Sequence, residues 1–114
     1  MNSISNSQEK DPLELLSDCA SNAHARIQSD FSDINPVVGV SRKLRGMGIN
    51  ADTMTIDCLK SGKRIIIILQ DEMPAIVRFQ FSYIEQDPAD EFELLALSEL
   101  SDDRLYEWMK NYFS

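Results

Sequence analysis

Few side chains in this sequence have the types and spacing that catalysis requires. Adjacent carboxylates such as Asp71-Glu72 and Asp102-Asp103 occur in turn or helix-capping contexts. Carboxylates that act together in one cleft need to point the same way, as alternate residues of a strand do. The single histidine, His24, is not near a serine or cysteine in any recognisable nucleophile motif. Phosphate-binding and dinucleotide-binding glycine motifs are also missing from the sequence. We therefore predict a protein without enzymatic activity.

The sequence offers no set of metal ligands. Two cysteines and one histidine are too few for a closed zinc site. Cys19 falls on a predicted helix and Cys58 on a predicted strand, both at apolar positions, so we expect buried free thiols. We predict no metal ion and no cofactor.

Charge is distributed unevenly along the chain. Its 114 residues have a net charge of −8. Residues 1–70 contain eight acidic and eight basic residues, whereas residues 71–114 contain eleven acidic and three basic ones. Such an excess favours solubility, and it can also form an acidic face that attracts a basic partner and repels nucleic acid. The acidic part ends in a segment rich in aromatic residues, which are typical of protein-binding hot spots.

These two features predict a small acidic protein-binding module, such as an adaptor, an inhibitor or an immunity-type protein. It would engage a basic protein surface through its C-terminal part. Acidic groups would steer the encounter, and aromatic rings that lie off the apolar stripe of the last helix would hold the partner. The predicted contact residues are Asp90, Glu91, Glu93, Asp102, Asp103, Tyr106, Glu107 and Phe113.

Two other functions fit the sequence. The first is that of a homodimeric protein, similar in class to secretion chaperones, which binds an extended client on a sheet face of mixed polarity. The second is that of a nucleic-acid binder with two basic clusters, 42–45 and 60–64. The basic residues are Arg42, Lys43, Arg45, Lys60, Lys63 and Arg64. Nucleic acid is the less favoured partner because the net charge is negative.

The elements that position these side chains begin after a polar leader. Residues 1–10 are rich in Ser, Asn and Gln, which predicts disorder. Asp11-Pro12 predicts a helix start, and apolar residues at steps of three and four continue to Ile34. Asn35-Pro36 ends this helix and opens a predicted second one, which stops at Gly46.

A β-hairpin forms the predicted centre of the fold. Thr53–Lys60 alternates apolar and polar residues, and Ile65–Leu69 is a continuous run of branched apolar residues. With Ser61-Gly62 as a two-residue turn, Cys58 pairs with Ile65. One face of this hairpin is wholly apolar and would carry the helices, while the other face is mixed.

Two further strands and a helix complete the prediction. Ala75–Ile84 alternates and predicts a third strand, whose aromatic side belongs to the core face. Glu91–Leu97 suits a strand or a helix, and we favour a strand. Ser101 begins a last helix. The apolar stripe of that helix consists of Leu105, Trp108, Met109 and Tyr112.

The sequence thus predicts one α+β domain over residues 11–114. Its parts are two N-terminal helices, a three- or four-stranded antiparallel meander and a C-terminal helix, with the helices packed on one sheet face. No apolar run is long enough to span a bilayer, and the N-terminus lacks a secretory signal. We therefore expect a cytoplasmic protein.

Overall fold

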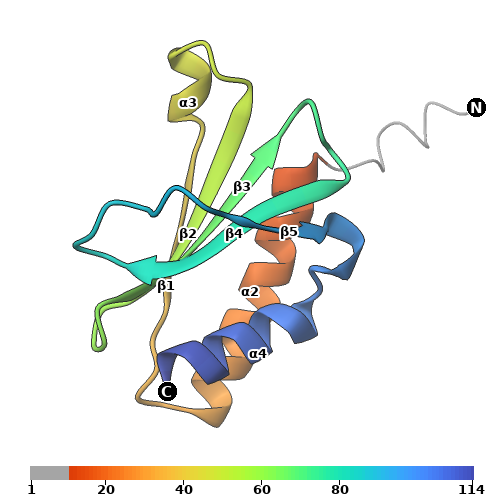
Figure 1. Cartoon of the computed structure of the whole chain (residues 1–114). Helices are drawn as coiled ribbons and strands as arrows, with labels where there is room; N and C mark the ends of the chain where they lie inside the picture. Colours follow the sequence, from red (N-terminus) through yellow and green to blue (C-terminus); the bar gives the residue numbers. More distant parts are fainter. Residues whose placement is uncertain (1–10) are drawn as a thin grey trace, which may run out of the picture.

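A five-stranded antiparallel sheet carries two helices on one of its faces (Figure 1). The computed structural model describes residues 11–114, so the predicted leader, residues 1–10, lies outside the described part. The elements in order are α2 (Pro12–Asp30), β1 (Val37–Ser41), α3 (Lys43–Gly46), β2 (Ala51–Cys58), β3 (Lys63–Gln70), β4 (Ile76–Tyr83), β5 (Glu93–Ala96), the 3₁₀ turn η1 (Leu97–Glu99) and α4 (Asp102–Phe113). Each strand pairs with the next one along the chain. The predicted α+β class and antiparallel meander are confirmed, but the sheet has five strands rather than the predicted three or four.

Helix α2 begins where the sequence predicts. The Asp11 carboxylate accepts a hydrogen bond from the Leu13 N–H at 3.2 Å, and Pro12 occupies the first helical position. The helix ends at Asp30, four residues earlier than predicted, and the Phe31 N–H closes it with a bond to the Ile27 carbonyl. The residues that α2 buries against the sheet and α4 are Leu13, Leu16, Ala20, Ala23 and Ile27.

The predicted second helix is wrong. Residues 37–41 form strand β1, and α3 is a single turn. Valine is β-branched and fits a pleated strand, and Gly39 weakens a helix. Antiparallel pairing with β2 then supplies the backbone hydrogen bonds that a weak helix would otherwise have made. Gly48, with a φ of +84°, turns the chain toward β2.

The central hairpin forms, but its register differs from the prediction by two residues. Cys58 pairs with Lys63 and Ile56 with Ile65, so the connection is longer than the predicted two-residue turn. Gly62 has a φ of +74°, and its N–H bonds to the Cys58 carbonyl at 2.8 Å. A shift of two residues leaves every side chain on its original face, because the side-chain period of a strand is two.

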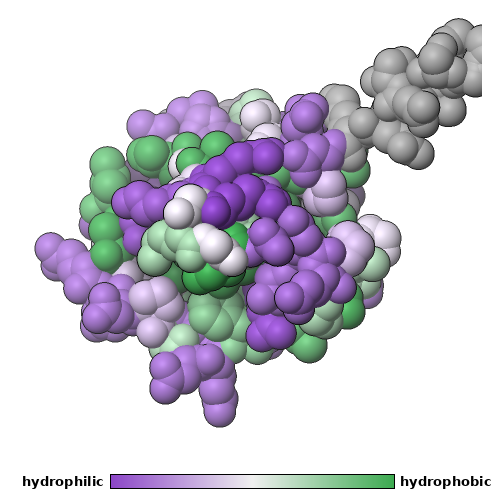
Figure 2. Space-filling view, turned by 90° about the horizontal axis from the view of Figure 1, so that it is seen from above, coloured by the Kyte–Doolittle hydropathy of each residue, from purple (hydrophilic) through white to green (hydrophobic). Residues whose placement is uncertain are grey.

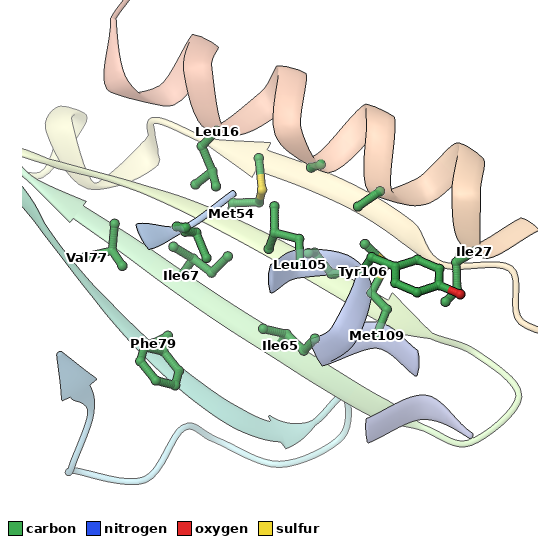
Figure 3. Packing of buried hydrophobic residues seen from close by; sticks show 14 of the residues in the cluster. Leu16, Ile27, Met54, Ile65, Ile67, Val77, Phe79, Leu105, Tyr106 and Met109 are labelled. Carbon is green, nitrogen blue, oxygen red and sulfur yellow. The ribbon is translucent and has the colours of Figure 1, made fainter. Parts of the chain in front are cut away.

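The apolar hairpin face packs against the helices as predicted (Figure 3). Met54, Ile65 and Ile67 are fully buried there beneath Leu16 and the α4 residue Leu105. Strands β4 and β5 continue this face, and the ambiguous segment 91–97 does contain a strand.

The aromatic side of β4 is only partly covered. Phe79 is buried, whereas Phe81 and Tyr83 are exposed although they lie on the same face. The Phe81 ring contacts the rings of Trp108 and Tyr112, at centroid distances of 5.4 and 5.0 Å. The core therefore ends in an aromatic cluster at the C-terminal end of α4.

Helix α4 starts at the predicted cap, because the Ser101 hydroxyl accepts a bond from the Arg104 N–H at 3.2 Å. Leu105 and Met109 are buried as predicted. The prediction that Tyr106 and Phe113 lie off the apolar stripe is wrong, because both are buried in the core. The helix contacts both the sheet and α2, so it buries a wider face than a single stripe (Figure 3).

Within residues 11–114, no helix is both long enough and apolar enough to cross a membrane.

Candidate functional site

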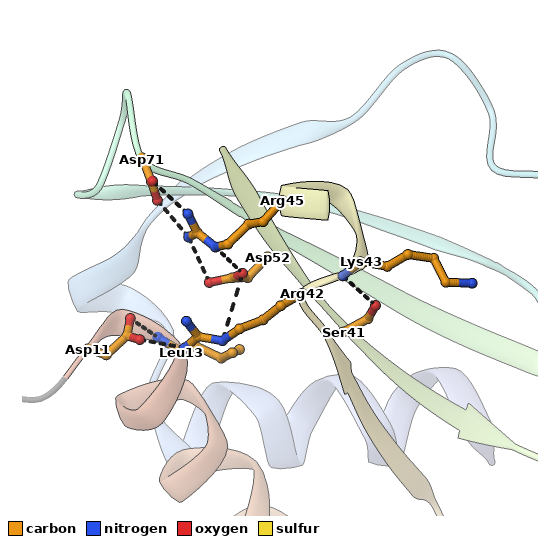
Figure 4. Close-up of polar contacts among 8 residues, drawn as sticks. All are labelled: Asp11, Leu13, Ser41, Arg42, Lys43, Arg45, Asp52 and Asp71. Atoms are coloured by element: carbon orange, nitrogen blue, oxygen red, sulfur yellow. Dashed lines mark hydrogen bonds and ion pairs between the residues drawn. The ribbon is translucent and has the colours of Figure 1, made fainter. Parts of the chain in front are cut away.

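The basic cluster 42–45 lies at the α3 end of the sheet, where it meets acidic side chains (Figure 4). The Arg45 guanidinium bonds to both oxygens of Asp52, at 2.7 and 3.0 Å, and to both oxygens of Asp71, at 2.8 Å each. Arg42 bonds to Asp11 at 2.6 Å and lies 4.0 Å from Asp52. We call these two arginines and three aspartates the arginine network.

The arginine network joins elements that are distant in sequence. Asp52 is on β2, Asp71 directly follows β3, and Asp11 caps α2. The side chain of Asp52 is only 3% exposed, so its charge needs the two-pronged partner that Arg45 supplies. Arg42 lowers the pKa of Asp11, and Arg45 lowers the pKa of Asp71, through these same bonds. The network therefore holds the end of the sheet to the start of α2.

The second basic cluster is engaged as well. Arg64 bonds to both oxygens of Asp57, at 2.7 and 2.8 Å. Lys60 lies 3.3 Å from Asp33, and Lys63 donates to the Tyr112 carbonyl at 2.9 Å. Of the six basic residues considered for nucleic-acid binding, Lys43 is the one for which the described structure contains neither an ion pair nor a side-chain hydrogen bond. These contacts leave little positive charge for phosphate groups.

The surface at the α3 end carries both hydrophilic and hydrophobic side chains. Seen from above, a band of strongly hydrophilic side chains crosses the middle of this end, with hydrophobic side chains beside it (Figure 2). The arginine network belongs to this end of the molecule, and its two positive and three negative groups largely cancel each other. The network therefore gives this end no strong excess of either charge.

The chain between β4 and β5, together with Glu93 at the start of β5, has a different character. We call residues 84–93 the acidic loop, because it contains no basic residue and five acidic ones. The acidic residues are Glu85, Asp87, Asp90, Glu91 and Glu93. All five are exposed, and among the described residues none forms an ion pair.

Gln80 on β4 holds the acidic loop in place. Its amide nitrogen donates to the carbonyls of Ala89 and Glu91, at 3.0 and 2.8 Å, and its amide oxygen accepts from the Ala89 N–H at 2.9 Å. Gln80 is 8% exposed and points to the sheet face opposite the helices. The acidic side chains beside Ala89 are therefore displayed from a segment that is fixed to the sheet.

The predicted contact residues form two groups rather than one. Asp90, Glu91 and Glu93 belong to the acidic loop, whereas the remaining residues belong to α4 on the other side of the sheet (Figure 1). The two aspartates of the α4 group contact α2 directly. Asp102 accepts from Asn22 at 3.0 Å, and Asp103 pairs with Arg26 at 2.5 Å.

The aromatic members of the α4 group have structural contacts. The Tyr106 hydroxyl donates to Asp30 at 2.6 Å, and this bond raises the pKa of Tyr106. Arg26 lies 4.2 Å above the same ring. Phe113 is buried in the core. Among the α4 residues of the prediction, Glu107 is exposed and forms no ion pair in the described structure.

An apolar groove of about 530 Å³ lies between α2 and the segment that precedes α4. Cys19 lines it, and burial, followed by the neighbouring Asp102, raises the pKa of this thiol to about 11. The thiol therefore stays protonated at neutral pH and is a poor nucleophile. Both cysteines are free, and Cys58 is buried as predicted, whereas Cys19 is partly exposed.

Other side chains that could take part in catalysis or bind metal have structural roles or are not grouped together. The His24 ring nitrogen Nε2 lies 2.8 Å from the Pro36 carbonyl, which ties α2 to the start of β1. Within the described range, no three His, Cys, Asp or Glu side chains are grouped so that they could hold a metal ion. Asp57 accepts a bond from Arg64, and Arg78 donates to Gln70, so Asp57 and Arg78 do not pair with each other.

Sequence reasoning missed the residue that organises the site. Gln80 reads in the sequence as one of several polar residues on a half-solvated strand face, and nothing in its spacing points to residues 89–91. Its polar type fits the alternation of the strand, so the sequence contained no distinct signal for its role.

The chain matches no protein-family model, and comparison with curated proteins and with solved structures found no significant similarity.

Proposed function

We propose that this protein is a small non-enzymatic binding module that engages a basic protein surface through its acidic loop. The contact residues are those of the predicted set that lie on this loop, Asp90, Glu91 and Glu93, with Glu85 and Asp87 adding to the field. Glu107 is a secondary contact. A cytoplasmic place of action is part of the same proposal.

The observation that supports the proposal is that most basic side chains have a bonding partner within the described fold, whereas the acids of the loop do not. Nearly all basic side chains of the described part are paired with an acid or bonded to another polar group, whereas the five acids of the loop have no such partner. Several like charges on one exposed segment repel each other, which costs stability. A basic partner would relieve that repulsion and would be drawn to the loop from a distance.

The fixed position of the loop supports the same function. A segment that is already ordered loses less conformational entropy when it binds than a free one does. Gln80 provides that order with three hydrogen bonds, and none of them uses an acidic side chain. The carboxylates are therefore left available for lysine and arginine side chains of a partner.

The test compares two variants that remove equal charge. The loop variant carries Asp90→Asn, Glu91→Gln and Glu93→Gln, and the control variant carries Glu14→Gln, Glu72→Gln and Glu99→Gln, all at exposed positions. Each tagged protein is purified gently from its own cells and analysed by native mass spectrometry. We expect the wild type and the control variant to retain the same basic protein in stoichiometric amount, with retention falling as salt rises. Loss of that protein from the loop variant alone supports the proposal. Equal retention by both variants contradicts it.

One observation favours the homodimeric, secretion-chaperone-like alternative. In the described part, no helix covers the sheet face opposite α2 and α4 (Figure 1), and the apolar residues Ile68 and Leu94 lie on it. An extended client could lie across this face. A homodimer that carries a second, extended polypeptide in the same mass spectrum would favour this function over the first.

A further inference from the structure

The outer edge of β1 is unprotected in the described structure. β1 is the first strand of the sheet and pairs with β2 alone, so one side of its backbone has no strand beside it. Its valines Val37, Val38 and Val40 are 48%, 36% and 53% exposed. Edge strands usually avoid further pairing by means of lysine, proline or a bulge. The five residues of β1, Val-Val-Gly-Val-Ser, contain none of these.

The sequence of β1 is nearly symmetric about Gly39. In an antiparallel pair of two such strands with Gly39 opposite its own copy, Val38 lies opposite Val40 of the second copy. Val38 and Val40 pair with Ile56 and Met54 of β2, whose side chains point to the helices. Four valines, two from each copy, would therefore meet on the helix side of the joint sheet, where each would lose its exposure to water.

We propose that β1 pairs with β1 of a second copy of this chain, antiparallel and centred on Gly39, so that two five-stranded sheets become one continuous sheet. This arrangement is a two-fold symmetric interface, in which each copy contributes the same surface. About four to six backbone hydrogen bonds would form between the strands, depending on which backbone groups point outward. Gly39 suits the two-fold axis of this dimer because it has no side chain on the sheet face opposite the helices, where the two copies of residue 39 meet.

Charge favours the second copy at this edge, although each copy carries a net charge of −8. The acidic loop is fixed to β4, which is three strands away from β1 in the sheet, so its repulsion acts at a distance. Lys43 follows β1 and forms no ion pair within residues 11–114. Antiparallel pairing brings the end of β1 in one copy near the start of β1 in the other copy. Lys43 follows that end by two residues, and the exposed Asp33, which contacts Lys60 in its own copy, precedes that start by four. Symmetry creates this opposite-charge approach twice.

The inference does not depend on the proposed function. Pairing at β1 leaves the acidic loop on the opposite part of the sheet unoccupied. A dimer without a basic partner, or a basic partner bound to a monomer, would separate the two proposals.

The first experiment measures the dimer dissociation constant by sedimentation equilibrium. The wild type, Val40→Lys and the matched control Leu94→Lys are compared, because Leu94 is an exposed apolar residue on β5, the opposite edge strand. We expect a wild-type dimer, a dissociation constant about tenfold higher or more for Val40→Lys, and no change for Leu94→Lys. Circular dichroism verifies the fold of each variant. If Val40→Lys does not fold, Val40→Thr keeps the β-branched shape and should weaken the dimer in the same direction.

The second experiment tests the register. A chain with Val38→Cys and a differently tagged chain with Val40→Cys are mixed and oxidised. Cross-links between the two different chains, in excess over those formed by either chain alone, are expected, because position 38 faces position 40 of the second copy. A wild-type protein that is monomeric at its highest soluble concentration overturns the inference. So does a dimer that Val40→Lys leaves unchanged, or one that cross-links equally well in all combinations.

Discussion

At the α3 end of the sheet, two arginines meet three aspartates, whereas the acidic loop contains five acids and no base. The first region lies where α2, β2 and the β3–β4 turn come together, and its charges are bonded within the fold. The second region is held by a neutral side chain, Gln80, and its charges face solvent. The two groups contain the same number of ionisable residues, but one group is bonded within the fold and the other faces solvent.

The comparison teaches that the number of charges in a region says little about its role. A carboxylate whose partner lies within the same chain contributes to stability, while a carboxylate without one contributes to the field outside the molecule. Asp52 is the clearest member of the first kind, because its side chain is buried and doubly bonded to Arg45.

The largest effect is expected from Arg45→Met. This change keeps much of the side-chain length but leaves Asp52 buried without its two-pronged partner, and Asp71 without a bond. We expect the Tm to fall by about 5 °C or more, as measured by circular dichroism. Lys43→Met, two residues away in the same helical turn and without an ion pair in the described structure, is the control and should change the Tm little. Equal losses in both variants would show that the arginine network does not hold this end of the sheet.

A smaller effect is expected from Gln80→Ala. The change leaves backbone groups of Ala89 and Glu91 without their partner, so the unfolding free energy should fall by about 1–2 kcal/mol in urea titration. Amide hydrogen exchange in residues 84–93 should become faster, because the loop is no longer fixed to β4. Gln86→Ala, at an exposed loop position, is the control. Unchanged exchange in the Gln80 variant would mean that other contacts order the loop.

The pH dependence of stability should distinguish the two regions further. Arg42 and Arg45 lower the pKa values of Asp11 and Asp71 in the folded protein. Their contribution is therefore present above about pH 4, and it is lost as the pH falls through the lowered pKa values, when these carboxylates take up protons. We expect the stability difference between wild type and Arg45→Met to narrow below about pH 4. A difference that stays constant down to pH 2 would argue against this linkage.

The smallest effect on stability is expected from the loop variant with Asp90→Asn, Glu91→Gln and Glu93→Gln. None of the three carboxylates has an ion-pair partner in the described chain, so their removal should change the unfolding free energy by no more than about 0.5 kcal/mol, or raise it slightly. Urea titration at neutral pH measures this directly. A loss comparable to that of Arg45→Met would remove the distinction between the two regions.

Much of the fold could be predicted from sequence because local patterns agree with it. The Asp11-Pro12 start of α2, the Ser101 start of α4 and the apolar faces of the hairpin follow from capping and from side-chain periodicity. The hairpin register was predicted with an error of two residues. The assignment of side chains to the two sheet faces was still correct, because side chains alternate with a period of two along a strand. The periodicity of apolar residues therefore predicts which face is buried even where the length of a turn is predicted wrongly.

Features that depend on distant contacts could not be predicted. Residues 37–41 become a strand because β2 pairs with them, although their spacing also fits a helix. Tyr106 and Phe113 are buried because α2 lies against α4, which a single helix pattern does not reveal. Asp102 and Asp103 were predicted as partner contacts, but both accept bonds from α2, some 80 residues earlier in the chain, which no local pattern reveals.

The most direct test of the account is a titration of the isotope-labelled protein with a short peptide of lysine and arginine residues, followed by two-dimensional NMR. If the acidic loop is the free anionic surface, the largest amide shifts will occur in residues 84–93, and residues 42–45, 52 and 71 will shift little because their charges are paired. These shifts should disappear in the loop variant and persist in its matched control. Shifts centred on the arginine network, or spread evenly over all acidic residues, would contradict the division of charge on which the proposed function rests.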